Sequence, residues 1–245
     1  MTGDPANARS PRDLIDLHAR TLFVHDASDR LIAINDTQRS PAARFFLGRT
    51  SQGVISRVRH DLPAALADRL TQLAAREPVP DDLEQPPGCL DEVRALLAAH
   101  GPITDEYAGP EYSFPARISL AELATRAPDV VAITASNAHT LTRWLPEWLP
   151  DVKAGGPIMA VLVDGDAVAI CACARVPGQA THAGVETHPE HRGHGHAALA
   201  TAAWAPAIRA LGILPLYGTS WTNRASQRVA AKLGLVRYGA SLSIA

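Results

Sequence analysis

The chain has 245 residues, of which 47% are hydrophobic and 20% charged, a composition typical of a globular protein with a buried core. Its net charge of −2 indicates neither a nucleic-acid nor a membrane partner. The sequence contains no run of about 18 apolar residues, so we expect no membrane span. The polar N-terminus lacks the apolar region of a signal peptide. The 3 cysteines have no zinc-like spacing. We also expect no structural disulfide framework among them, so a reducing, cytoplasmic setting is the expectation.

The first half of the chain predicts a small α+β region. Ser10 and Asp13 are typical of the first turn of a helix. Short strands are expected next, over residues 30–36, 44–50 and 53–60. A second helix is predicted to be capped by Asp61 and stopped by Pro78, and a third to close at Gly101. Residues 1–10 are expected to be disordered, and this half contains no catalytic motif that we can name.

The second half predicts a mixed α/β sheet. A strand over 129–134 is followed by a helix over 137–149, in which Trp144 and Trp148 share one face and are expected to pack in the core. The turn at residues 164–166, Asp-Gly-Asp, is the strongest hairpin signal in the chain. The remaining elements are expected in the order strand, helix, strand, helix, strand, over residues 181–187, 195–211, 214–221, 223–234 and 236–244.

A glycine-rich turn lies between a strand that ends at Thr187 and a helix that begins near Gly195. Its sequence over 188–204 reads HPEHRGHGHAALATAAW. Gly193 and Gly195 allow the backbone to turn tightly, so the free N–H groups of the helix's first turn can face an anion such as a phosphate. An ordinary strand-to-helix turn would explain the glycines equally well.

The spacing of this turn is more specific than its glycines. Arg192, Gly195 and Ala197 fit the R/Q-x-x-G-x-G/A motif, and the sequence resembles the GCN5-related N-acetyltransferase (GNAT) superfamily. Downstream, residues 223–226 are similar to the family's N-x-x-A/S helix start, and residues 232–235 to its K-x-G-F turn. A Walker loop is excluded because no Gly-Lys-Ser/Thr follows.

The resemblance extends over roughly residues 129–245 and implies a domain organisation. Residues 129–245 would be a GNAT-like, acetyl-CoA-binding catalytic domain with the α/β fold of that superfamily. Residues 1–128 would be an additional α+β region of unknown role.

The resemblance also implies a co-substrate, acetyl-CoA, held where two parallel strands splay apart. Backbone groups near Val185 would pair with the pantetheine amides, and the amides of the glycine turn would bind the pyrophosphate. The residues implied to contact the cofactor are Val185, Glu186, Thr187, Arg192, Gly193, His194, Gly195, His196, Ala197, Asn223 and Ser226.

The expected reaction is acetyl transfer to an amine, which needs a base for the ammonium and an acid for the departing thiolate. The family's usual acid is a tyrosine, and Ala230 occupies that position. Tyr217, Ser220, Ser226 or water would have to replace it. Glu186 and His182 are the candidate bases, with His188 behind them. Strand alternation puts Glu186 on the opposite face from its neighbours Val185 and Thr187.

Four histidines cluster around the turn: His188, His191, His194 and His196. We expect a partly cationic rim near the phosphates and no metal, because the side chains of an amide-presenting loop diverge. The expected acceptor is a small-molecule or peptide amine, with no nucleic-acid or membrane partner, and a homodimer is an open alternative. Two other functions also stay open, a catalytically silent acyl-CoA-binding or sensor module and a nucleotide or phosphometabolite binder.

Overall fold

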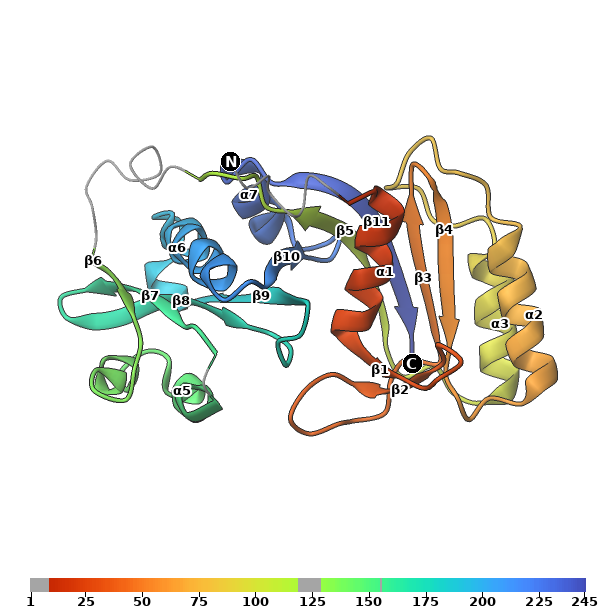
Figure 1. The fold of residues 1–245 in the computed structure, drawn as a ribbon, viewed down its shortest axis with the longest axis horizontal. Helices are drawn as coiled ribbons and strands as arrows, with labels where there is room; N and C mark the ends of the chain where they lie inside the picture. The colour runs from red at the N-terminus through yellow and green to blue at the C-terminus, as the bar shows by residue number, and fades with distance from the viewer. Residues whose placement is uncertain (1–8, 119–128, 155) are drawn as a thin grey trace. The chain divides into compact units, whose positions relative to one another are not determined.

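The chain forms two compact units in the computed structural model, which describes residues 9–118, 129–154 and 156–245 (Figure 1). The first unit comprises residues 1–113, 218–224 and 237–245. The second unit comprises residues 114–217 and 225–236. Most of the expected N-terminal disorder, residues 1–8, lies outside the described residues. The predicted domain boundary at residue 128 also lies outside the described residues, so the division into domains stays a prediction.

The first unit is built on an antiparallel arrangement of strands. Its elements are α1 (Pro11–Leu22), β1 (Phe23–His25), β2 (Leu31–Ile34), β3 (Phe45–Thr50), β4 (Gly53–Val58), α2 (Ala64–Ala75), α3 (Leu90–His100), β5 (Glu106–Ser113) and most of β11 (Val236–Ile244). The strand order is β4-β3-β11-β5. Because β3 is antiparallel to both β4 and β11, the C-terminal strand completes a sheet that the N-terminal strands begin.

Helices cover both faces of this sheet (Figure 1). Phe45 and Leu47 of β3 face the apolar sides of α2 and α3 in one core cluster. On the opposite face, α1 approaches β3 so closely that a Cβ at Gly48 would lie 2.4 Å from Cγ1 of Ile15. The predicted start of α1 is confirmed, since the backbone N–H of Asp13 donates to the Ser10 hydroxyl at 3.1 Å.

Two details of the first unit differ from the prediction. Asp61 does not cap α2, because the helix begins at Ala64 with Pro63 before it, and Asp61 instead accepts a hydrogen bond from Arg59 Nε at 2.7 Å. Strand β5 was not predicted, because its sequence, EYAGPEYS, has little strand propensity and includes a proline. Backbone bonds to residues distant in the sequence help to hold it, such as Trp221 N–H to the Ala108 carbonyl at 3.1 Å.

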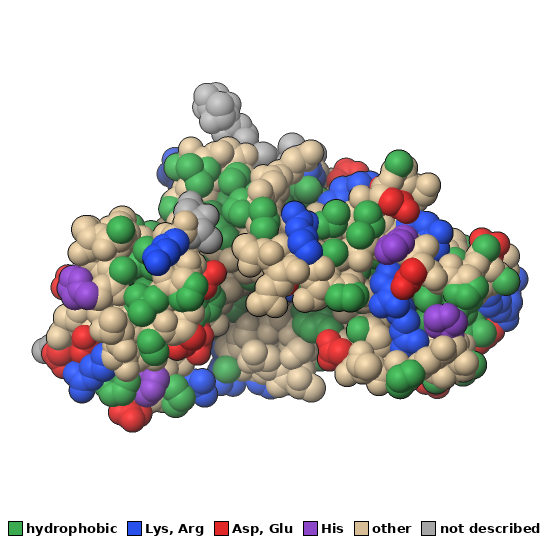
Figure 2. All heavy atoms as spheres, turned by 90° about the horizontal axis from the view of Figure 1, so that it is seen from below, with side chains coloured by type: hydrophobic (Ala, Val, Ile, Leu, Met, Phe, Trp, Pro, Cys, Tyr) green, Lys and Arg blue, Asp and Glu red, His purple; other side chains and the backbone are tan. Residues whose placement is uncertain are grey.

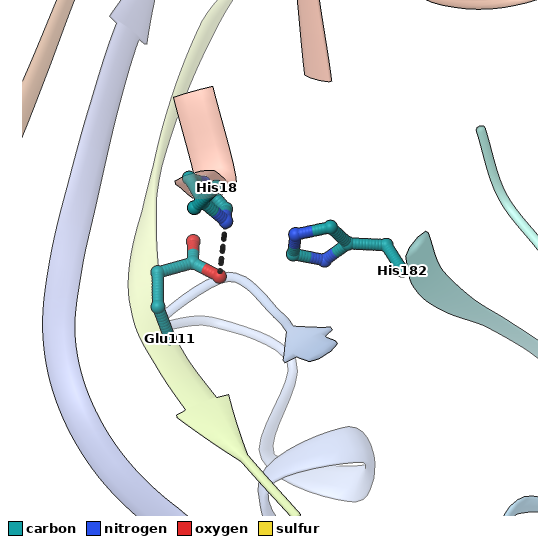
Figure 3. A group of neighbouring side chains, drawn as sticks. All are labelled: His18, Glu111 and His182. Atoms are coloured by element: carbon teal, nitrogen blue, oxygen red, sulfur yellow. Dashed lines mark ion pairs between the residues drawn. The ribbon is translucent and has the colours of Figure 1, made fainter. Parts of the chain in front are cut away.

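Strand β5 carries Glu111, whose carboxylate points toward the imidazole of His18 on α1 (Figure 3). The Glu111 side chain is 0% exposed, accepts a hydrogen bond from the Ser241 hydroxyl at 2.7 Å and lies 3.4 Å from Nδ1 of His18. Burial raises its pKa well above the ordinary value, although the Ser241 and Tyr107 hydroxyls act in the opposite direction. The stability of the first unit should therefore depend on pH.

The second unit contains the mixed sheet that the sequence predicts, with the strand order β10-β9-β8-β7-β6. Its elements are β6 (Asp129–Ala132), η1 (Ala138–Leu141), η2 (Pro146–Trp148), α5 (Leu149–Ala154), β7 (Met159–Val163), β8 (Asp166–Cys173), β9 (Ala180–Thr187), η3 (Pro189–His191), α6 (His196–Ala210), β10 (Leu214–Gly218) and α7 (Arg224–Lys232). Strands β9 and β10 are parallel and the other neighbours antiparallel, so the predicted α/β class is confirmed.

The hairpin prediction is confirmed, and the helix prediction before it is partly wrong. Asp164 and Gly165 have φ angles of 52° and 87°, as a two-residue turn between β7 and β8 requires. Residues 137–149 form two 3₁₀ turns rather than one helix, because Pro146 interrupts the backbone pattern. Trp144 and Trp148 still pack against the core, as predicted.

Acidic and basic side chains lie among one another on the face that Figure 2 shows, in keeping with the net charge of −2. Across the ranges that the structure describes, every helix is too short or too polar to cross a lipid bilayer.

Candidate active site

The glycine turn exposes the start of α6. Gly193 and Gly195 have φ angles of 83° and 84°, a left-handed conformation that side-chain-bearing residues rarely adopt. Gly195 precedes the first helical residue, and no side chain caps the N–H groups that follow. These N–H groups and the helix dipole therefore create a positive site suited to an anion.

Lys232 adds a full positive charge to this turn. It is the last residue of α7, and its Nζ lies so close to Gly195 that a Cβ there would be 2.8 Å from it. A Cβ at Gly193 would instead meet nothing within 4 Å. From the sequence, Lys232 was identified only as part of the K-x-G-F-like turn. Its proximity to Gly195 was missed, because no local pattern around residue 232 indicates it. The two features together fit a pyrophosphate.

Strands β9 and β10 run side by side only at their beginnings. Their parallel register pairs Leu214, Pro215 and Leu216 with residues 180–182. Strand β9 continues to Thr187, and its antiparallel pairing with β8 reaches that residue. Within the described part of the second unit, the second half of β9 thus has β8 on one side and no paired strand on the other.

The pairing with β8 decides which backbone groups face this open edge. The backbone carbonyl of His182 accepts from the Ala174 N–H at 2.8 Å, and the backbone N–H of His188 donates to the Val168 carbonyl at 3.0 Å. Alternate residues of an antiparallel strand direct their backbone groups to the same neighbour, so those of Val185 and Thr187 point away from β8. This edge can pair with an amide-containing chain such as a pantetheine arm, and Arg192 Nε already donates to the Thr187 carbonyl at 3.1 Å.

Glu186 lies on the side-chain face opposite that of Val185 and Thr187, as predicted. It is paired with Ile170, whose side chain belongs to the core cluster of η1, η2 and α5. There the Trp148 indole N–H donates to Oε2 of Glu186 at 2.7 Å. The carboxylate is therefore tethered at the open edge of β9, on the face away from α6.

Tyr217 and Ser226 are brought together. The two side-chain hydroxyls are 2.7 Å apart, and the Tyr217 hydroxyl also donates to the Ser226 carbonyl at 3.3 Å. Tyr217 is only 2% exposed and packs edge-on against Phe114. A hydroxyl pair of this kind can pass a proton along its hydrogen bond, so both residues stay candidates for the acid.

The two other residues considered near the thiol end are less informative. Ala230 is 1% exposed, so a tyrosine at that position would have to displace its neighbours. Asn223 lies in the first unit, where its backbone N–H donates to the Ser220 hydroxyl at 3.2 Å, and its predicted contact with the cofactor stays a prediction.

The four histidines of the turn form two separate aromatic groups. His188 and His191 pack against Trp144, with ring centroids 4.5 and 5.2 Å away. His194 and His196 stack on each other with centroids 5.6 Å apart. Burial and then His194 and His191 lower the pKa of His196, which is thus mostly neutral at pH 7 and adds little to the cationic rim that we expected.

His182 is a poor base in this structure. Its side chain is buried, and burial together with the charge of Arg175 lowers its pKa to about 3. His182 is therefore less able than an ordinary histidine to take a proton from an ammonium at neutral pH. Glu186, which Trp148 holds by a hydrogen bond, stays a candidate base.

A model of a known protein family matches part of the second half of the chain. Residues 151–240 match the family model described as GNAT acetyltransferase. No curated protein matches the chain in sequence.

Solved structures are similar to the chain only distantly. A GCN5-related N-acetyltransferase-like protein from Streptococcus suis has a TM-score of 0.49 and 15% identity over 86% of each chain. A putative GNAT-family acetyltransferase from Novosphingobium aromaticivorans has a TM-score of 0.46 and 19% identity over 58% of this chain and 66% of that one. An aminoglycoside N-acetyltransferase in complex with CoA has a TM-score of 0.36 and 20% identity over 43% of this chain and 90% of that one. These likenesses are too weak to carry an argument about function. The family model and the motif spacing therefore point to the same part of the chain: residues 151–240 are similar to the GNAT acetyltransferase family.

Proposed function

We propose that the protein is an acetyl-CoA-dependent N-acetyltransferase that acts in the cytoplasm on a small-molecule or peptide amine. One observation carries the proposal: a glycine turn with uncapped helix N–H groups and the Lys232 ammonium follows directly after a strand with an open edge. CoA has the matching chemistry, since its pyrophosphate is anionic and its pantetheine arm carries amides. Neither nucleic acid nor a membrane is part of the proposal.

The cofactor's two ends would be held by different groups. The amides from Arg192 to Ala197 and the ammonium of Lys232 would bind the pyrophosphate by charge-assisted hydrogen bonds. The backbone groups of Val185 and Thr187 would pair with the pantetheine amides in the manner of an added strand. The Thr187 hydroxyl is buried with no hydrogen-bond partner among the described residues, and a bound cofactor could supply one.

Acetyl-CoA supplies the acetyl group as a thioester. Glu186 would accept the proton that the acceptor's ammonium must lose before its nitrogen attacks the carbonyl carbon. The hydroxyl pair of Tyr217 and Ser226 would donate a proton to sulfur as the carbon–sulfur bond breaks. A thiol has a pKa of about 8.5, so the thiolate leaves readily even with weak acid assistance.

A second candidate function is a catalytically silent acyl-CoA-binding or sensor module. Ala230 favours it, because that position lacks the hydroxyl expected of the family's acid. Such a module would bind CoA as the enzyme does and would release no thiol with any amine.

Calorimetry with CoA and a thiol-release assay with a panel of amines test the proposal. Gly195→Asp places a side chain and a negative charge at the pyrophosphate site, so we expect it to abolish measurable CoA binding. Unchanged CoA affinity in this variant would contradict the site. CoA binding without thiol release on any amine would favour the silent module, and equal competition by simple nucleotides would favour a nucleotide binder.

A further inference from the structure

The hydrogen bond between Trp148 and Glu186 joins two residues that are 38 positions apart in the sequence, and one of them is the candidate base. Trp148 is the last residue of the short 3₁₀ turn η2 (Pro146–Trp148). The turn is anchored by Leu145, which is 1% exposed in the core cluster of the second unit. The indole therefore approaches β9 from a well-packed position.

The contact leaves one carboxylate oxygen available. Trp148 Nε1 donates to Oε2 at 2.7 Å, which is the short distance typical of a bond to a charged acceptor. In the part of the chain that the structure describes, Oε1 of Glu186 has no hydrogen-bond partner, and it is not among the buried unsatisfied atoms. One oxygen is thus fixed and the other can receive a proton.

The β9 backbone around Glu186 also keeps the carboxylate near the open edge of the strand. The Trp148 ring passes over Gly184, where a Cβ would lie 3.5 Å from the indole Cη2. Val185 and Thr187 flank Glu186 and direct their backbone groups to the open edge of β9. A carboxylate rooted between these two residues stays beside the edge only if its side-chain torsions are restricted, and the indole supplies that restriction.

We infer that Trp148 is a positioning residue for acyl transfer: its indole N–H holds one oxygen of Glu186, so that the other faces the acceptor ammonium at the open edge of β9. The inference deepens the proposed function and rests on it. The same hydrogen bond could serve only to attach η2 to the sheet. A positioning role and a purely structural role differ in their effect on turnover.

Trp148→Phe tests the inference, since phenylalanine keeps an aromatic ring and loses the N–H. We expect kcat to fall about tenfold, with the KM for acetyl-CoA unchanged, because a hydrogen bond to a charged group is lost without touching the pyrophosphate site. Trp144→Phe is the matched control, since Trp144 packs on the same core without a bond to Glu186, and its kcat should stay within about twofold.

A double-mutant cycle separates positioning from fold support. In a Glu186→Gln background, adding Trp148→Phe should change kcat no further, because the group on which Trp148 acts is already gone. Full additivity, or an unchanged kcat in Trp148→Phe, would overturn the inference while wild-type turnover still supported the proposed function. A wild type that transfers acetyl to no amine would overturn both.

Discussion

The contact between Gly195 and Lys232 predicts how the cofactor site should respond to a single added methyl group. Gly195→Ala places a Cβ 2.8 Å from Nζ of Lys232, closer than the two atoms can pack, so the ammonium must move away. The alanine must also adopt a φ of 84°, which costs about 1–2 kcal/mol. The variant should therefore lose both stability and CoA affinity.

The size of the affinity loss follows from the lysine. A hydrogen bond to a charged group contributes about 1.5–3 kcal/mol, and we take the lower end because Lys232 is exposed. A loss of about 1.4 kcal/mol is tenfold in Kd. Isothermal titration calorimetry with CoA should thus show roughly tenfold weaker binding by Gly195→Ala, and a similar loss by Lys232→Met, which has no backbone strain.

Gly193→Ala is the control that separates strain from charge. Its φ of 83° brings the same backbone cost, but the new Cβ would have no atom within 4 Å. Both alanine variants should lower the free energy of unfolding by about the same 1–2 kcal/mol. If Lys232→Met bound CoA as tightly as the wild type, or if the two glycine variants lost affinity equally, the role of Lys232 would be refuted.

Three further predictions concern stability. Ala230→Tyr should destabilise the protein by about 1–3 kcal/mol in a thermal melt, since the site is 1% exposed, and a gain in turnover without destabilisation would contradict this burial. Because burial raises the pKa of Glu111 above 4.5, the folded protein binds that proton more tightly than the unfolded chain, so the free energy of unfolding should fall as pH rises above about 4.5. Glu111→Gln should flatten this dependence in urea titrations, and an equal slope would refute the assignment. Asp61→Ala should change stability by less than about 0.5 kcal/mol, whereas a loss near 1 kcal/mol would indicate a helix cap after all.

The features predicted from the sequence are those that neighbouring residues determine. Ser10 and Asp13 sit one helical turn apart, and the Asp164-Gly165 turn needs only its own two residues. The glycine turn before α6 is of the same kind, because its left-handed conformations are a property of Gly193 and Gly195 themselves.

The features that the sequence did not predict depend on contacts between distant residues. Lys232 reaches Gly195 because α7 ends beside the start of α6, and Trp148 contacts Glu186, which lies 38 residues further along the chain. Strand β5 forms through pairing rather than propensity. Such contacts have no signature within the short windows from which local structure is inferred.

The most direct test of the central claim is a crystal structure of the protein with CoA. We expect pyrophosphate oxygens within hydrogen-bond distance of the amides that precede α6 and of Lys232 Nζ, with the pantetheine arm along Val185 and Thr187. CoA bound elsewhere on the chain, or no CoA bound at millimolar concentration, would contradict it.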